Sequence, residues 1–212
     1  MILGGYARIE TAAREAGLLV MGTLLHEGRT LVLLGAGAGF WPLFRAAPEY
    51  ADRLPDPVDR WSLRVIGGLA AQFGAEALYP FGGPPYQPFI AWARASGRAF
   101  PSPVGMLVHD AVGMMISYRG ALLLPGGIDT PRPQGQSPCP ACSRPCATAC
   151  PVGALSDRHG YDIEACHTYL DTEAGEDCMT NGCAVRRACP LSAGAGRGAE
   201  QSAHHMKAFH KR

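Results

Sequence analysis

Cysteine is missing from the first 138 residues of this chain, and lysine is nearly missing from all 212, with Lys207 and Lys211 the only two. The net charge is +1, which excludes a global electrostatic attraction to nucleic acid or to an anionic membrane. No apolar run approaches the roughly 20 residues that span a bilayer. The first residues lack the charged and apolar regions of a secretory signal. We therefore expect a cytoplasmic protein without a nucleic-acid or membrane partner.

The residues that are present are typical of a globular protein with many turns. Hydrophobic residues make up 47% of the chain, enough to bury a core, and 27 glycines and 18 prolines predict frequent loops. Apolar periodicity predicts an α+β N-terminal domain with a small, mostly antiparallel sheet and packed helices. Asp59 is expected to cap one helix. The expected helices are residues 9–17, 60–73, 89–96, 161–170 and 199–212, and residues 184–188 are expected to form a short helix or a turn. The expected strands are 18–25, 31–34, 106–108, 113–118 and 121–124.

Two glycine-rich segments could bind a ligand. Residues 35–39 read Gly-Ala-Gly-Ala-Gly, but the next residue is Phe40 and not the third glycine of a dinucleotide-binding fingerprint. We interpret this segment as a turn where backbones pass closely, with phosphate binding as the alternative. Residues 78–86, which end at Tyr86, contain too many prolines and glycines for regular structure. This aromatic loop is either a rigid lid on the core or the wall of a site for a flat cofactor.

All the cysteines lie in one stretch of the last third of the chain. The first four form the run C-x2-C-x3-C-x3-C followed by proline, and a second Cys-Pro pair closes the stretch. Two 4Fe–4S clusters need eight thiolates, and in two-cluster ferredoxins a similar run gives its last cysteine to the other cluster. We therefore expect two clusters with crossed ligation. The predicted ligands are Cys139, Cys142, Cys146, Cys150, Cys166, Cys178, Cys183 and Cys189.

Three other uses of these cysteines stay open. Disulfides are rare in the reducing compartment that a chain without a secretory signal indicates. Structural zinc also suits C-x2-C pairs, although such sites usually combine two well-separated pairs. The third alternative is a module that has lost its metal. Under the cluster interpretation, the apolar run 151–155 would exclude water, and free backbone N–H groups, including that of Gly153, would donate to sulfur.

Polar side chains near the cysteines have roles in the same interpretation. Arg144, Arg186 and Arg187 flank cysteines and would offset the negative charge of a cluster or attract an acidic partner. His167 follows Cys166 and would bond a sulfur or lie near a cluster. We interpret the remaining candidates as structural residues or as a solvated or docking face, and they are His109, Asp110, Tyr118, His204, His205 and His210.

The order of these segments resembles a known group of proteins. Residues 112–126, Val-Gly-Met-Met-Ile-Ser-Tyr-Arg-Gly-Ala-Leu-Leu-Leu-Pro-Gly, resemble a strand of the CblC-type cobalamin-processing proteins. The cysteine run, Cys-His-Thr-Tyr-Leu at 166–170 and the closing Cys-Pro resemble epoxyqueuosine reductases, which are related to reductive dehalogenases. Leu-Tyr-Pro-Phe-Gly-Gly-Pro-Pro at 78–85 is similar to a signature of bacterial ferredoxin-like proteins of the same group.

This resemblance implies a small nitroreductase/CblC-like N-terminal domain followed by a two-cluster 4Fe–4S ferredoxin-like module. It implies that a cobalamin or flavin binds the N-terminal domain, with Tyr86, Met114 and Tyr118 as cofactor-binding candidates. We find no counterpart of the aspartate motif of epoxyqueuosine reductases, so no catalytic residue is predicted. The resemblance also implies one cluster on Cys139, Cys142, Cys146 and Cys189, and another on Cys150, Cys166, Cys178 and Cys183.

These observations predict three parts, which are an α+β domain at 1–134, the two-cluster module at 135–195 and a helical tail at 196–212. The main functional hypothesis is an iron–sulfur protein that transfers single electrons and has a redox partner protein. One alternative is a corrinoid- or flavin-dependent reductase, in which the clusters feed a cofactor in the N-terminal domain. The other alternative is a zinc-stabilised interaction module.

Overall fold

The computed structural model describes residues 3–131, 135–156 and 160–211, and it divides into two compact units. Unit 1 contains Met1–Arg98 and Ser117–Gln136, and unit 2 contains Ala99–Ile116 and Ser137–Arg212. The sequence analysis predicted three consecutive parts and placed residues 99–116 in the N-terminal domain. In the structure these residues belong to unit 2, which carries the cysteines. Helices and antiparallel ladders occur in both units, so the α+β class is confirmed.

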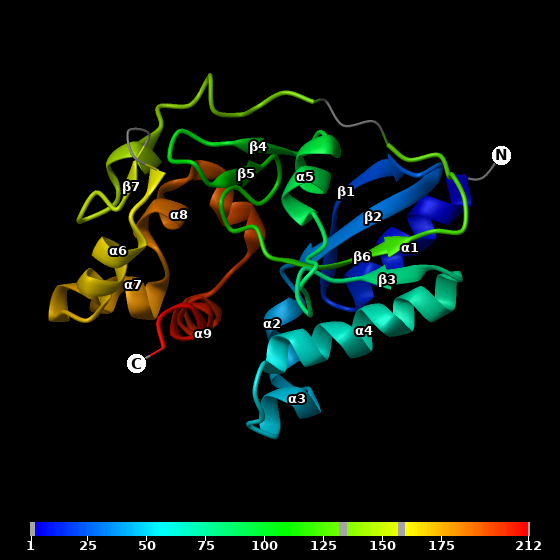
Figure 1. Cartoon of the computed structure of the whole chain (residues 1–212), viewed down its shortest axis with the longest axis horizontal. Coiled ribbons are helices and arrows are strands. Elements are labelled where there is room, and N and C mark those ends of the chain that lie inside the picture. Colours follow the sequence, from blue (N-terminus) through cyan, green and yellow to red (C-terminus); the bar gives the residue numbers. More distant parts are fainter. Residues whose placement is uncertain (1–2, 132–134, 157–159, 212) are drawn as a thin grey trace. The chain divides into compact units, whose positions relative to one another are not determined.

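Unit 1 is built on a four-stranded antiparallel sheet in the order β1-β2-β6-β3 (Figure 1). The predicted hairpin is confirmed as β1 (Leu18–His26) and β2 (Arg29–Ala36), joined by a turn in which Glu27 and Gly28 both have positive φ. β6 (Tyr118–Leu123) pairs with β2 and with β3 (Glu76–Leu78).

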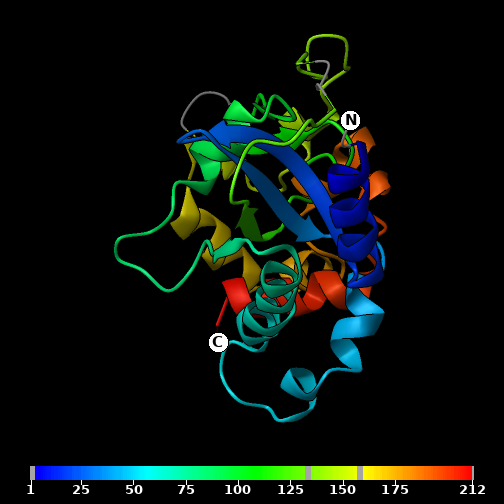
Figure 2. The same ribbon diagram turned by 90° about the vertical axis from the view of Figure 1, so that its right-hand side faces the viewer.

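The core of unit 1 lies between the sheet and the helices α1 (Leu3–Glu15) and α4 (Pro57–Phe73). Alternate strand residues such as Val32 and Leu34 point to this core, as the period of two along a strand requires. Figure 2 shows α1 alongside the blue strands β1 and β2. In residues 35–39, Gly37 donates its N–H to Gly17 O at 3.0 Å, in keeping with the close backbone passage expected there.

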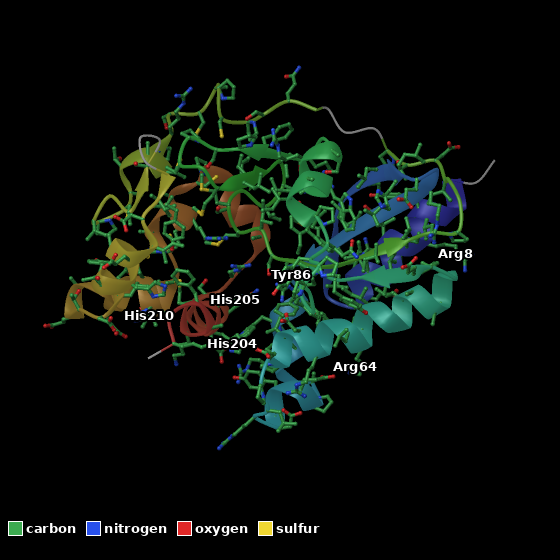
Figure 3. The ribbon with its side chains drawn as sticks, in the orientation of Figure 1. Arg8, Arg64, Tyr86, His204, His205 and His210 are labelled. Carbon is green, nitrogen blue, oxygen red and sulfur yellow. The ribbon has the colours of Figure 1, made fainter. Side chains whose placement is uncertain are left out.

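Three short helices complete unit 1. They are α2 (Phe40–Arg45), α3 (Pro48–Ala51) and α5 (Phe89–Ala95), of which only α5 was predicted. α2 carries the buried, stacked rings of Phe40 and Phe44. Arg64 of α4 holds α3 through an ion pair with Glu49, whose oxygen lies 2.6 Å from Arg64 Nε (Figure 3).

Unit 2 contains short strands and helices around the cysteines. Two separate two-stranded antiparallel ladders are present in its described residues, one of β4 with β5 and one of β7 with β8. The elements are β4 (Ala99–Pro101), β5 (Leu107–His109), η1 (Pro145–Thr148), β7 (Leu155–Ser156), β8 (Gly160–Tyr161), α6 (Ile163–Leu170), η2 (Glu173–Gly175), α7 (Glu176–Asn181), α8 (Ala184–Ala188), η3 (Pro190–Ala195) and α9 (Ala199–Phe209).

Two local predictions are wrong. α4 begins at Pro57, whose fixed φ suits a first helical position, so Asp56 is the cap. Asp59 lies instead in the first turn, where its carboxylate accepts a hydrogen bond from Arg119 at 3.3 Å. The predicted strand at 113–118 is also absent, because Gly113 has a φ of +57° and turns the chain there. Within the described residues, no helix is long and apolar enough to cross a membrane.

We predict that Ile66→Ala destabilises unit 1 by about 2–5 kcal/mol, because Ile66 is fully buried in α4 and the change leaves a cavity. The matched control is Leu63→Ala on the exposed side of the same helix, with an expected change within about 0.5 kcal/mol. Urea unfolding followed by tryptophan fluorescence measures this, since all three tryptophans lie in unit 1. Equal losses in both variants would contradict the core described above.

Candidate metal centre

Thiols that are distant in the sequence meet in unit 2, and the first group forms around Cys146. Burial raises the pKa of the Cys146 thiol, and the three neighbouring thiolates raise it further. Cys139 experiences the same two effects, with a hydrogen bond to Ser137 acting in the opposite direction. Cys139, Cys142 and Cys189 line one hollow, and Cys146 is buried in the same apolar cluster as Cys189. The first group therefore consists of Cys139, Cys142, Cys146 and Cys189.

The second group forms around Cys166. Burial raises the pKa of Cys166, a hydrogen bond with Tyr161 lowers it, and the three neighbouring thiolates raise it again. The four sulfur-bearing residues line one hollow, whose other lining residues are mostly apolar. This second group consists of Cys150, Cys166, Cys178 and Cys183.

Neighbouring cysteines of the sequence therefore belong to different groups. Cys146 lies in η1 and Cys150 is the second residue after it, yet they belong to the first and second group respectively. Likewise Cys183 caps the start of α8 and Cys189 caps its end. Cys183 belongs to the second group and Cys189 to the first. The chain therefore passes from one group to the other at η1 and again at α8.

Residues of the 99–116 segment wall the first group. Val104, Val108 and Met114 are buried in one cluster with Cys146 and Cys189. Sequence reasoning missed this role, because the segment lies before the cysteines and carries no metal-ligand pattern. Its apolar residues were assigned to strands of the N-terminal domain.

A close contact holds this wall to the chain after Cys189. Met114 N donates to Ser192 Oγ at 3.1 Å, and a Cβ on Gly113 would overlap the backbone of Ser192. Arg186 also donates to Met114 O at 2.9 Å. Gly113 is therefore required both by its positive φ and by the space available.

Several donors point at the cysteine sulfurs. The N–H of Arg144 donates to Cys142 Sγ at 3.3 Å, and that of Ala154 donates to Cys150 Sγ at 3.2 Å. The prediction for Gly153 is wrong, since its N–H donates to the carbonyl of Cys150. Such donors favour a negatively charged sulfur over a neutral one.

Tyr161 adds a side-chain donor to the second group. Its hydroxyl donates to Cys166 Sγ at 3.4 Å, and burial followed by this bond raises the pKa of Tyr161 beyond the usual range for a phenol. The phenol therefore keeps its proton and remains a donor at neutral pH. The apolar residues 151, 152, 154 and 155 line the same hollow, as expected for a run that limits water there.

The predicted arginines mostly bind backbone or acidic groups. Arg187 donates to Gly182 O at 2.9 Å and forms a short ion pair with Asp177. Arg144 provides the backbone donor described above, and its charge lowers the pKa of the Cys139 thiol, as that of Arg187 does for Cys178. The arginines thus bind the loops that carry the cysteines and also favour the thiolate form of nearby cysteines.

The histidine beside the second group is part of a chain of polar groups that runs through buried His210 to exposed Asp171. His167 Nδ1 lies 2.5 Å from His210 Nδ1, and His210 Nε2 lies 3.0 Å from Asp171 Oδ1. If His210 Nε2–H donates to the carboxylate, then Nδ1 of neutral His210 accepts a hydrogen bond from His167 Nδ1–H. His210 is only 7% exposed, so its expected place on a solvated face is wrong. His204 and His205 precede it on α9 (Figure 3), and burial lowers the pKa of His204.

The candidate residues for an organic cofactor belong to different units. Tyr86 lies on the loop after β3 and is 66% exposed, and Tyr118 begins β6, both in unit 1 (Figure 3). Met114 belongs to unit 2 and packs on the first group. His109 is fully buried, and its Nδ1 accepts the N–H of Ala111, which is a structural role.

Each group offers four thiols in apolar surroundings with hydrogen-bond donors to sulfur. In residues 3–131, 135–156 and 160–211, no three His, Cys, Asp or Glu side chains have the arrangement of a site for a metal ion. Compared with known protein families and with curated proteins, the chain matches no family model and no curated protein.

We predict that Gly113→Ala loosens the wall of the first group, because the new methyl group would overlap Ser192. Hydrogen exchange should become faster at the amides of 113–116 and 191–195. Gly198→Ala in the same unit is the control, since a Cβ there meets nothing within 4 Å. Unchanged exchange in the Gly113 variant would show that this contact does not hold the wall.

Proposed function

We propose that the chain is an iron–sulfur protein that binds two 4Fe–4S clusters and transfers single electrons. The observation that supports this is the division of the eight thiols into two groups of four, with Cys150 and Cys189 exchanged between the halves of the stretch. This exchange is what crossed ligation of the two-cluster ferredoxin type would require.

The donor sets fit such clusters. Four thiolates per group are the required ligands, and N–H or O–H donors to sulfur together with apolar surroundings are the features by which proteins tune cluster potentials. When bound, the clusters would supply one-electron chemistry. The chain itself supplies the ligands, the donors Arg144, Ala154 and Tyr161, and the apolar wall that includes Met114.

We also propose the finer fold and family relation that the cysteine pattern suggests. Unit 2 would be a two-cluster ferredoxin-like module, and unit 1 a small domain of the nitroreductase/CblC type. Eight free thiols fit a reducing compartment, in agreement with a cytoplasmic location. A corrinoid or flavin in unit 1 stays a prediction.

The first test is the content of iron, acid-labile sulfide and zinc in protein purified without oxygen. We expect about eight iron and eight sulfide per chain, four of each for every cluster. Zinc without sulfide would overturn the proposal and support the structural-zinc alternative.

Single cysteine variants test the division into groups. Cys146→Ser and Cys189→Ser should lose the electron paramagnetic resonance (EPR) signal of the first group's cluster, and Cys150→Ser and Cys178→Ser should lose that of the second group's cluster. Each variant should contain about half of the iron of the unchanged chain. The decisive comparison is Cys146 against Cys150, because these neighbours in sequence should behave differently. If they lose the same signal, the ligands are not crossed.

Tyr161→Phe should lower the reduction potential of the second group's cluster only. The lost O–H donor stabilises negative charge on Cys166 sulfur, and this charge is greatest in the reduced state. Tyr169→Phe is the matched control, since Tyr169 lines the same hollow but donates to Ala174 O at 2.6 Å. A redox titration followed by EPR measures both potentials, and equal shifts in the two variants would contradict a specific role of Tyr161.

A further inference from the structure

The exposed apolar side chains of unit 2 gather beside the second group of cysteines. In the described part of this unit, the large apolar residues that are exposed are Val152, Tyr161, Ile163 and Phe209, at 45%, 40%, 53% and 40%. We call these four residues the exposed patch. Isolated exposed apolar residues need no explanation, but a group of them at one place indicates an interaction site.

Each member of the exposed patch is tied to the second group by a contact or by its element. Val152 lines the hollow of the four cysteines, and Tyr161 bonds Cys166. Ile163 begins α6, the helix that carries Cys166. Phe209 stacks on Tyr161 with ring centres 6.3 Å apart and on His167 at 4.7 Å. The exposed patch therefore lies directly beside Cys166.

A shallow groove continues from the exposed patch over α6. Its lining contains one residue of the exposed patch, two acidic residues and the hydroxyl-bearing side chains of α6 and the residues after it. The lining residues are Val152, Asp162, Glu164, Ala165, Thr168, Tyr169 and Thr172. The surface here is thus a concave strip with apolar and acidic side chains interleaved.

Acidic side chains outnumber basic ones in this region. From Gly160 to Val185 the sequence contains no lysine or arginine, and all its acidic side chains are exposed. Near the patch, α9 and the residues after it add Lys207 and Lys211, and Arg187 forms an ion pair with Asp177, which still leaves an excess of negative charge. The acidic residues are Asp162, Glu164, Asp171, Glu173, Glu176 and Asp177.

We propose that the exposed patch and this groove are the docking surface for a protein partner that presents lysines and arginines around an apolar contact. Complementary charges steer encounter and fix orientation, while the apolar centre provides contact area. The redox role of this partner, which would exchange electrons with the cluster of the second group, rests on the proposed function. The docking surface does not depend on it.

A second copy of this chain fits the same surface less well. A symmetric dimer would place the same face on both sides and bring the acidic residues of the two copies together. Like charges facing each other disfavour such a contact. Charge complementarity therefore favours a basic partner.

The test measures binding of the whole chain to a basic c-type cytochrome, which is kept in its reduced form so that no electron moves. An acidic cytochrome b5 serves as the comparison. We expect the basic probe to bind at least about tenfold more tightly than the acidic one at low salt, and the difference to shrink as salt screens the charges. Hydrogen exchange should show protection of 160–172 in the complex.

Matched variants separate the apolar and charged contributions. Ile163→Ser and the pair Glu164→Gln with Glu173→Gln should each weaken binding about threefold or more. The controls are Ile90→Ser, at an isoleucine of unit 1 that is 69% exposed, and the pair Glu15→Gln with Glu27→Gln. Both controls should bind like the unchanged chain.

Equal binding of both probes, equal effects of variants and controls, or protection elsewhere would overturn the docking surface. Concentration-dependent self-association that only Ile163→Ser abolishes would also overturn it, in favour of a second copy. Iron and sulfide are measured in every sample. Selective binding by a chain without iron would refute the proposed function alone, and a loaded chain without selective binding would refute the docking surface alone.

Discussion

Burial of cysteine thiols is the constraint on which unit 2 depends. Cys146, Cys178 and Cys189 are buried, and their sulfurs form part of the small apolar clusters of this unit, where Leu170 and Val185 are among the few buried aliphatic residues. Burial raises the pKa of the Cys146 and Cys178 thiols, so their deprotonated form is disfavoured when nothing is bound to it. A bound group that stabilises the thiolates would therefore also stabilise the fold of this unit.

The crossed arrangement follows from the short distances between cysteines along the chain. η1 (Pro145–Thr148) turns the chain between Cys146 and Cys150, so that consecutive sulfurs face different groups. α8 (Ala184–Ala188) likewise lies between Cys183 and Cys189, so these two sulfurs also belong to different groups. Each group thus ties an early segment to a late one, which is why the stretch folds back on itself without long helices or strands.

Local signals in the sequence predicted much of the fold. The β1–β2 hairpin, α4 and α8 were found because apolar periodicity and turn residues act within a few positions. The position of residues 99–116 in unit 2 was not predicted, because it depends on a contact between Gly113 and Ser192 that no local pattern encodes. The grouping of the thiols was implied by a resemblance, because spacing alone left the partition open.

The same limit applies to the surroundings of the two groups. Met114 was assigned to an N-terminal cofactor site, yet it packs on Cys146 and Cys189, because burial of its side chain depends on the tertiary fold. His210 was expected in solvent, but Asp171 and His167 hold it in a buried position. As a result the first group has an internal apolar wall, whereas the second is bordered by exposed aromatic and acidic side chains. The residue types near the cysteines predicted similar surroundings for both groups. The surroundings differ because different distant segments of the chain pack on each group.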